Sequence, residues 1–211
     1  MFWGIWTLYL WIIIKSQKAM NKFSLQIIKT TLIAVFFLFN YATFAQSDFT
    51  LASGADLKVT GTSTLHDWDM KSSTATGKAQ ITLESGKVVN AKNVTITMPA
   101  ESIKSGKSGM DKNAYAALKT KDHKDVKFSL KELVVKGAGF EAIGDFTIAG
   151  VTKSAKFPVT ANLTGEKVTF KGQHDFKLTD YNIDPPTALM GTVKTGNEVS
   201  IHFNVTFQPT K

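Results

Sequence analysis

Apolar and polar residues alternate along four long runs between residues 140 and 207 of this chain. A period of two residues is typical of a β-strand whose side chains face a dry side and a wet side in turn. The runs are about ten residues long, as in the wall of a barrel. We therefore expect long strands around an apolar interior, with these residues facing inward: Phe140, Ala142, Gly144, Phe146, Ile148, Ala155, Phe157, Val159, Ala161, Leu163, Val168, Phe170, Gly172, His174, Phe176, Leu178, Val199, Ile201, Phe203, Val205 and Phe207.

Short turns rich in glycine separate the expected strands, as at Ser85-Gly86 and Gly137-Ala138-Gly139. Gly and Asn supply the positive φ angles that tight hairpins need. These turns divide the sequence into about eight strands in a meander, which is the number that closes a small barrel. We therefore predict an all-β, eight-stranded antiparallel barrel with strands at 57–65, 77–83, 88–98, 126–135, 140–149, 152–163, 168–178 and 199–207.

The segment 101–124 lacks this alternation. Asp111 is expected to cap a short helix over 113–118, because aspartate accepts hydrogen bonds from free N–H groups at a helix start. Tyr115 and Leu118 lie three residues apart and so share a face of that helix. We expect the helix to cover one mouth of the barrel.

The segment 179–194 contains Asp184-Pro185-Pro186 and cannot be a regular strand throughout. It is expected to form a long loop at a mouth of the barrel.

Residues 20–45 have the pattern of a secretory signal peptide. Lys22 lies in a basic start, residues 31–39 are apolar, and Ala45 is a small residue before the expected cleavage site. The mature domain would then be residues 46–211, in the periplasm or secreted. A permanent membrane anchor is the alternative, although the apolar run is shorter than the roughly 20 residues that span a bilayer.

Residues 1–19 form a second apolar segment, which a signal peptide does not need. We interpret them as an upstream start-site artefact, with translation beginning at Met20. A membrane hairpin of two helices is the competing interpretation.

The composition excludes several classes of protein. The chain has no Cys, which excludes disulfides, Cys-ligated metals and a lipoprotein anchor. Every basic residue apart from histidine is Lys, whereas a nucleic-acid reader would use Arg for bidentate contacts. We therefore expect no nucleic-acid partner.

Four segments together resemble the YceI-like family of lipid- and polyisoprenoid-binding proteins. They are Gly61–Trp68, Met110–Leu118 followed by His123–Phe128, Gly144–Lys153 and Thr179–Pro186. The resemblance covers about residues 48 to 208. It implies a lipocalin-like barrel whose long interior tunnel holds an isoprenoid or another amphiphilic lipid, in a protein commonly secreted to the periplasm. The common family pattern has a His without the Asp67-Trp68 pair that follows His66 here.

Two histidines stand out as candidates for contact with a ligand. His66 and Trp68 would lie on one side of a strand, where the indole offers an apolar wall and the imidazole a hydrogen bond to a polar head group. His174 lies on the predicted dry face. The alternative for all three is a structural role in the core. The predicted ligand-binding residues are His66, Trp68, Tyr115, Leu118, Phe128, Phe140, Phe146, Phe157, Phe170, Gly172, His174, Phe176 and Tyr181.

Gly172 is predicted to lie beside the ligand. Because glycine has no side chain, we expect it to leave room for a ligand close to the wall.

Catalytic and metal motifs are absent from the sequence: it has no G-x-S-x-G, H-E-x-x-H or P-loop. The leading hypothesis is a non-enzymatic carrier with an amphiphilic lipid as its partner, no cofactor, no membrane span in the mature form and possible homodimerisation. The runner-up is an enzyme, or a His-dependent metal protein, that acts on a bound hydrophobic substrate. A third alternative, an outer-membrane barrel, is disfavoured because the wet faces are densely charged.

Overall fold

The computed structural model describes residues 46–210. The predicted signal peptide at 20–45 and the segment 1–19 lie outside the described residues. Within 46–210, no helix is both long enough and apolar enough to cross a membrane.

Strands dominate the described part of the chain. They are β1 (Gln46–Leu51), β2 (Asp56–Ser63), β3 (Trp68–Ser72), β4 (Thr76–Glu84), β5 (Lys87–Pro99), β6 (Asp125–Lys136), β7 (Gly139–Ile148), β8 (Val151–Thr164), β9 (Lys167–Lys177), β10 (Thr187–Ala188) and β11 (Val193–Pro209). The helical elements are η1 (Ala100–Ser102), α2 (Ser108–Ala117) and η2 (Leu178–Tyr181).

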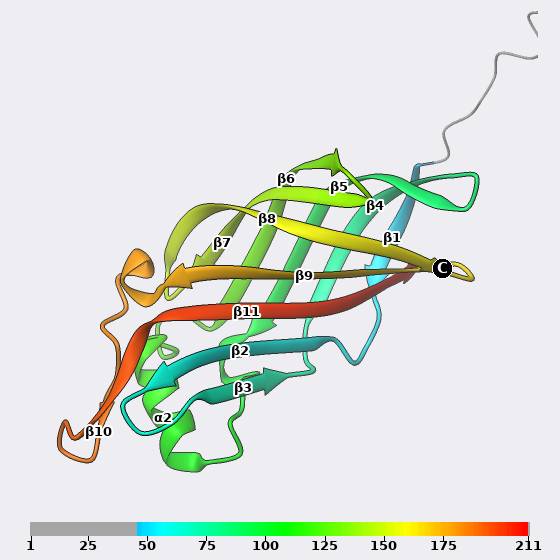
Figure 1. Ribbon diagram of the computed structural model, residues 1–211. Helices are drawn as coiled ribbons and strands as arrows, with labels where there is room; N and C mark the ends of the chain where they lie inside the picture. The colour runs from blue at the N-terminus through cyan, green and yellow to red at the C-terminus, as the bar shows by residue number, and fades with distance from the viewer. Residues whose placement is uncertain (1–45, 211) are drawn as a thin grey trace, which may run out of the picture. The chain divides into compact units, whose positions relative to one another are not determined.

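Eight antiparallel strands form a closed ring in the order β1-β4-β5-β6-β7-β8-β9-β11 (Figure 1). The ring closes where Phe49, Thr50 and Leu51 of β1 pair with Pro209, Gln208 and Phe207 of β11. One edge of β11 pairs with β1 near its end and with β2 along most of the rest of its length. The strand β3 then pairs with the free edge of β2. The predicted all-β fold, with eight antiparallel strands and a short helix within 101–124, is therefore confirmed.

One member of the ring differs from the prediction. The predicted strand 57–65 is β2, which pairs with β11 outside the ring, and β1 takes the eighth place. The strand also ends earlier, at Ser63, because the Ser63 hydroxyl accepts hydrogen bonds from the backbone N–H groups of Leu65 and His66 at 3.2 and 3.1 Å. The chain then turns and returns as β3.

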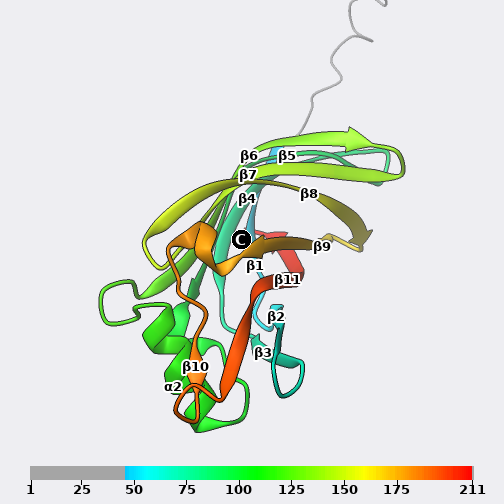
Figure 2. The ribbon, with the colours of Figure 1, turned by 60° about the vertical axis from the view of Figure 1, so that its left-hand side comes forward.

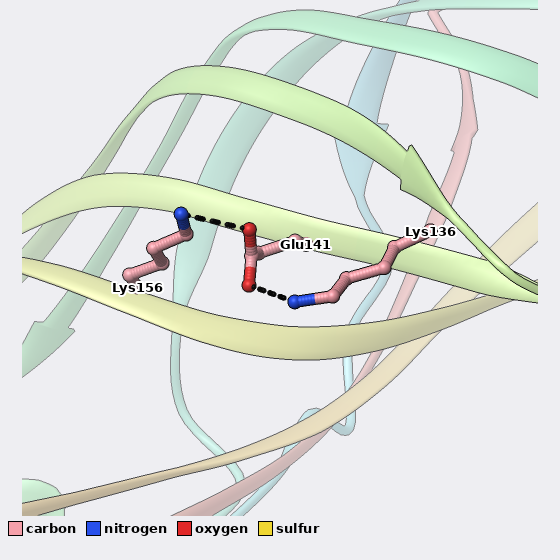
Figure 3. A network of polar contacts seen from close by, with 3 residues as sticks. All are labelled: Lys136, Glu141 and Lys156. Carbon is pink, nitrogen blue, oxygen red and sulfur yellow. Dashed lines mark hydrogen bonds and ion pairs between the residues drawn. The ribbon is translucent and has the colours of Figure 1, made fainter.

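The charged residues of β7, Glu141 and Asp145, alternate with the residues that line the cavity and so lie on the outer side of the ring, as predicted. Glu141 of β7 accepts hydrogen bonds from the ammonium groups of Lys136 and Lys156 at 2.7 and 3.0 Å (Figure 3). The two lysines come from the neighbouring strands β6 and β8. They hold the pKa of Glu141 below its usual range, with Lys136 the larger cause.

Apolar side chains fill one end of the ring, which we call the closed end. Phe49, Ile81, Val168, Val205 and Phe207 are each at most 2 % exposed there. The hairpins β4–β5 and β8–β9 and the C-terminus of the described chain lie at this end (Figure 1).

The connections α2, β2–β3 and η2–β10–β11 lie at the opposite end of the ring, which we call the mouth (Figures 1 and 2). The helix differs from the prediction at its start. It begins at Ser108 with Lys107 as N-cap, so Asp111 is not the cap. Instead, the Asp111 carboxylate accepts hydrogen bonds from the Ser105 hydroxyl and N–H at 2.7 and 2.8 Å. The predicted long loop 179–194 contains most of η2 and the short strand β10.

Candidate functional site: an apolar cavity inside the ring

A cavity of about 1240 Å³ runs from the mouth into the ring. Its wall draws on the inner faces of the ring strands, on β2 and β3, and on α2. Phenylalanine, methionine and aliphatic side chains make up most of this wall, because the alternating strands turn their apolar residues inward. The predicted inward parity of β7, β8, β9 and β11 is therefore correct.

The structure separates the predicted ligand-binding residues into two groups, although their role toward a ligand stays a prediction. One group lies on the cavity wall: His66, Trp68, Leu118, Phe128, Phe146, Phe157, Phe170 and Phe176. The other group lies outside the lining: Tyr115, Phe140, Gly172, His174 and Tyr181.

Aromatic rings from successive strands form a continuous cluster along one side of the cavity. Phe128 and Phe146 are directly opposed in the β6–β7 register, and their ring centroids are 4.8 Å apart. Phe157 of β8 lies 5.7 Å from both rings. Contacts of this kind stabilise the fold beyond simple area burial, so this side of the cavity is held in a defined shape.

His174 belongs to the same cluster, behind the cavity surface. Its imidazole stacks between Phe146 and Phe176, with centroid distances of 5.2 and 5.8 Å and interplanar angles of 6° and 17°. Burial among these rings lowers the pKa of His174, and the neighbouring Asp175 opposes this only in part. The imidazole therefore packs as a flat, neutral ring at pH 7.

Gly172 does not leave room for a ligand, contrary to the prediction. A Cβ atom at this position would lie 2.5 Å from Cζ of Phe203 and 2.8 Å from the carbonyl oxygen of Pro158. Phe203 is the cross-strand partner of Gly172, and its ring covers the glycine and faces the cavity. The glycine thus makes room for a wall residue.

The same arrangement positions Trp68. Its indole ring covers Gly61, the partner residue in the β2–β3 register, and its N–H donates to the carbonyl of Thr62 at 2.9 Å. The prediction placed His66 on the same strand as Trp68, but His66 lies in the turn that precedes β3. There its Nδ1 lies 2.7 Å from the carbonyl oxygen of Asp67. His66 and Trp68 both reach the cavity, but from different elements.

Tyr115 ties α2 to the segment before it. Its hydroxyl donates toward the carbonyls of Glu101 and Ile103, both at 3.0 Å, and accepts a hydrogen bond from Lys104. The tyrosine thus anchors the helix over the mouth.

Tyr181 and Phe140 support the wall from other places. Tyr181 of η2 is 2 % exposed and meets Phe176 edge-on at 5.0 Å, and burial raises its pKa to about 12. Phe140 pairs with Val135 and Val159, next to the β6–β7 hairpin.

Some wall residues were not predicted from the sequence: Met98 of the long strand β5, and several residues on short or irregular elements. Met70 and Met98 pack with Ile103 beside α2, and Leu65, Leu189 and Met190 border the mouth. Only one of these groups carried a visible signal: Leu189-Met190 is an apolar pair inside an otherwise polar loop. Among residues 46–210, no group of three or more His, Asp or Glu side chains could hold a metal ion.

Comparison with known proteins decides the family. A model of the YceI-like domain matches residues 63–207, which is more than half of the chain. The chain belongs to the YceI-like family. The resemblance expected from the sequence motifs is thereby confirmed. No curated protein sequence matches this YceI-like chain.

Solved structures share the fold of this YceI-like chain at low sequence identity. BcnA of Burkholderia cenocepacia is 18% identical with a TM-score of 0.60, over 72% of this chain and 95% of that protein. A polyisoprenoid binding domain from Saccharophagus degradans, implicated in plant cell wall breakdown, is 9% identical with a TM-score of 0.56, over 78% and 99%. The YceI protein of Campylobacter jejuni is 15% identical with a TM-score of 0.56, over 67% and 85%.

Proposed function

We propose that this protein binds and carries an amphiphilic lipid, such as an isoprenoid, with the tail inside the ring and the head group at the mouth. The observation that carries the proposal is the apolar cavity of about 1240 Å³. Pockets for small molecules commonly span about 300–1,000 Å³, so this cavity has room for a long tail.

The chemistry of the wall fits a hydrocarbon tail. Each buried methylene contributes about 0.8 kcal/mol to binding, so a long tail is held tightly without polar contacts along its length. Polar side chains that could meet a head group, including His66, Lys107 and Asn113, belong to the β2–β3 turn and to α2 with its N-cap at the mouth.

Relatives support binding over catalysis. The family is YceI-like, and the Saccharophagus degradans neighbour is a polyisoprenoid binding domain. We therefore infer a carrier rather than an enzyme, acting in the periplasm or after secretion, as the signal-peptide pattern at 20–45 suggests.

Native mass spectrometry and solvent extraction of the purified protein test the proposal. We expect a co-purifying lipid in wild type and a sharp loss of it in Ala142→Phe, because Ala142 is buried on the cavity wall and its new ring would fill the space. Ile143→Phe is the matched control, since Ile143 is the next residue of β7 and does not line the cavity. Equal lipid content in all three folded proteins would refute the proposed site.

A further inference from the structure

Three large apolar side chains are exposed together at the mouth. Leu65 is 66% exposed, Leu189 72% and Met190 fully exposed. Leu65 lies in the β2–β3 turn, and the other two lie in the β10–β11 turn.

The two turns are bonded to each other and form one unit. The N–H of Thr64 donates to the carbonyl of Lys194 at 3.0 Å, and the N–H of Lys194 donates to the Thr64 hydroxyl at 3.1 Å. The Thr64 hydroxyl also donates to the carbonyl of Thr192 at 3.3 Å. We call Leu65, Leu189 and Met190 the mouth tip.

The backbone of the mouth tip is strained. Leu189 and Met190 have φ values of +49° and +55°, and the N–H of Gly191 donates to the carbonyl of Ala188. A β-turn whose two central residues both have positive φ favours Asn and Gly there, because other side chains resist positive φ. Here an apolar pair adopts this conformation while exposed to water, so two unfavourable features coincide beside the cavity opening. Strain of this kind is a reason to look for a function.

The segment 101–124, which contains α2, carries an excess of positive charge at the same end of the molecule. The segment 101–124 carries six lysines and three acidic residues. Two of these acids already accept hydrogen bonds: Glu101 from Thr120, and Asp111 from Ser105. Lys107 itself lines the cavity.

We propose that the mouth docks on an anionic lipid membrane. The mouth tip inserts its three apolar side chains among the head groups, and lysines of the segment 101–124 contact the anionic phosphates. Exposed apolar side chains together with nearby lysines are the combination that binds proteins to such surfaces. Docking brings the opening of the cavity against the bilayer, so that a lipid tail can pass without crossing water. This inference rests on the proposed carrier function.

A second copy of the chain is a poorer occupant for this surface. The smallest aromatic side chains bury roughly 150 Å² each. If Leu65, Leu189 and Met190 each buried that much, the three would cover about 450 Å². A stable protein interface needs about 800 Å² on each partner. Insertion into a bilayer has no such requirement, because each side chain gains from burial on its own.

Flotation of the mature protein, residues 46–211, with vesicles tests the inference. One vesicle type contains equal parts of phosphatidylcholine and phosphatidylglycerol, and the other contains phosphatidylcholine alone. Wild type should bind the mixed vesicles more strongly, and added salt should weaken this preference. Leu65→Glu, or the pair Leu189→Glu and Met190→Glu, should weaken binding by about tenfold or more. Met190→Trp should strengthen it, because Trp favours the membrane interface.

The matched control is Val135→Glu. Val135 is as exposed as Leu65, at 66%, but lies beside the β6–β7 hairpin, away from the mouth (Figure 1). This variant should bind vesicles as wild type does. Equal losses in Val135→Glu and Leu65→Glu, or wild type that does not float with either vesicle, would overturn the docking proposal.

Uptake of cis-parinaric acid from solution separates this inference from the proposed function. Wild type that takes up the fluorescent fatty acid but ignores vesicles is a carrier that does not dock, and the docking inference fails alone. Wild type that takes up none contradicts the carrier function itself. A third outcome is that wild type binds no vesicles but self-associates, and that the Glu variants lose this self-association. The mouth tip would then bind a second copy of the chain, which also overturns the inference.

Discussion

At the residue scale, the imidazole of His174 is half-buried among aromatic rings that carry no charge. Phe146, Phe157 and Phe176 surround it, and burial depresses its pKa. A charged imidazole here would lose much of its hydration, so the folded protein resists protonation more than the unfolded chain does.

The sign of this shift predicts a loss of stability in mild acid. As the pH falls below the ordinary His value of about 6.5, the unfolded chain binds a proton before the folded protein does, so the free energy of unfolding decreases. His174→Phe keeps a flat ring and removes the proton site. We expect the urea midpoint of wild type to fall between about pH 7 and pH 5, and the midpoint of the variant to fall less. An equal decrease in both proteins would show that His174 is not the group responsible.

At the scale of elements, the alternation of residues and the turn motifs predicted those strands that pair with their neighbours in the sequence. The strands β6 to β9 are joined by short hairpins, and period-two alternation was enough to place them. The strand β1 was missed because it is short and its partners β4 and β11 are remote in the sequence. The role of Gly172 was predicted wrongly for a similar reason: its space is taken by Phe203 of β11, and the parity of one strand says nothing of the rings on the next.

Asp111 provides one of two tethers that hold the helix α2, beside that of Tyr115, and it can be removed by substitution. Asp111 holds the loop before the helix through Ser105, which keeps the pKa of the carboxyl below its usual range. Asp111→Ala removes the acceptor while alanine favours the helix itself. We expect faster amide exchange over residues 104–118 and faster release of bound cis-parinaric acid.

Lys112→Ala, an exposed change on the same helix, is the control for this tether and should leave both rates unchanged. Because the pKa of Asp111 is depressed, the tether is complete above the ordinary aspartate value and is lost as the pH falls through the folded one. Wild-type exchange over 104–118 should therefore accelerate in acid, and the Asp111→Ala variant should lack this additional step. Unchanged exchange in Asp111→Ala would mean that Tyr115 alone holds the helix.

For the whole molecule, the ring has a closed end and a mouth, and the two ends should control different properties of binding. Ala91 of β5 lines the cavity four residues beyond the β4–β5 hairpin and pairs with buried Ile81. Ala117 lines it from α2, at the mouth. A tail that enters from the mouth reaches Ala91 late and passes Ala117 first.

Ala91→Phe should therefore shorten the longest tail that fits, whereas Ala117→Phe should slow entry of every tail. Competition with geraniol, farnesol and geranylgeraniol against cis-parinaric acid measures the affinities at equilibrium, and its time course measures the association rates. In wild type, affinity should rise with tail length, because each further methylene contributes about 0.8 kcal/mol when buried. Ala91→Phe should remove the gain for the longest alcohol and leave geraniol binding unchanged. Ala117→Phe should keep the order of affinities and lower the association rates. If Ala91→Phe weakened geraniol as much as geranylgeraniol, tails would not enter from the mouth toward the closed end.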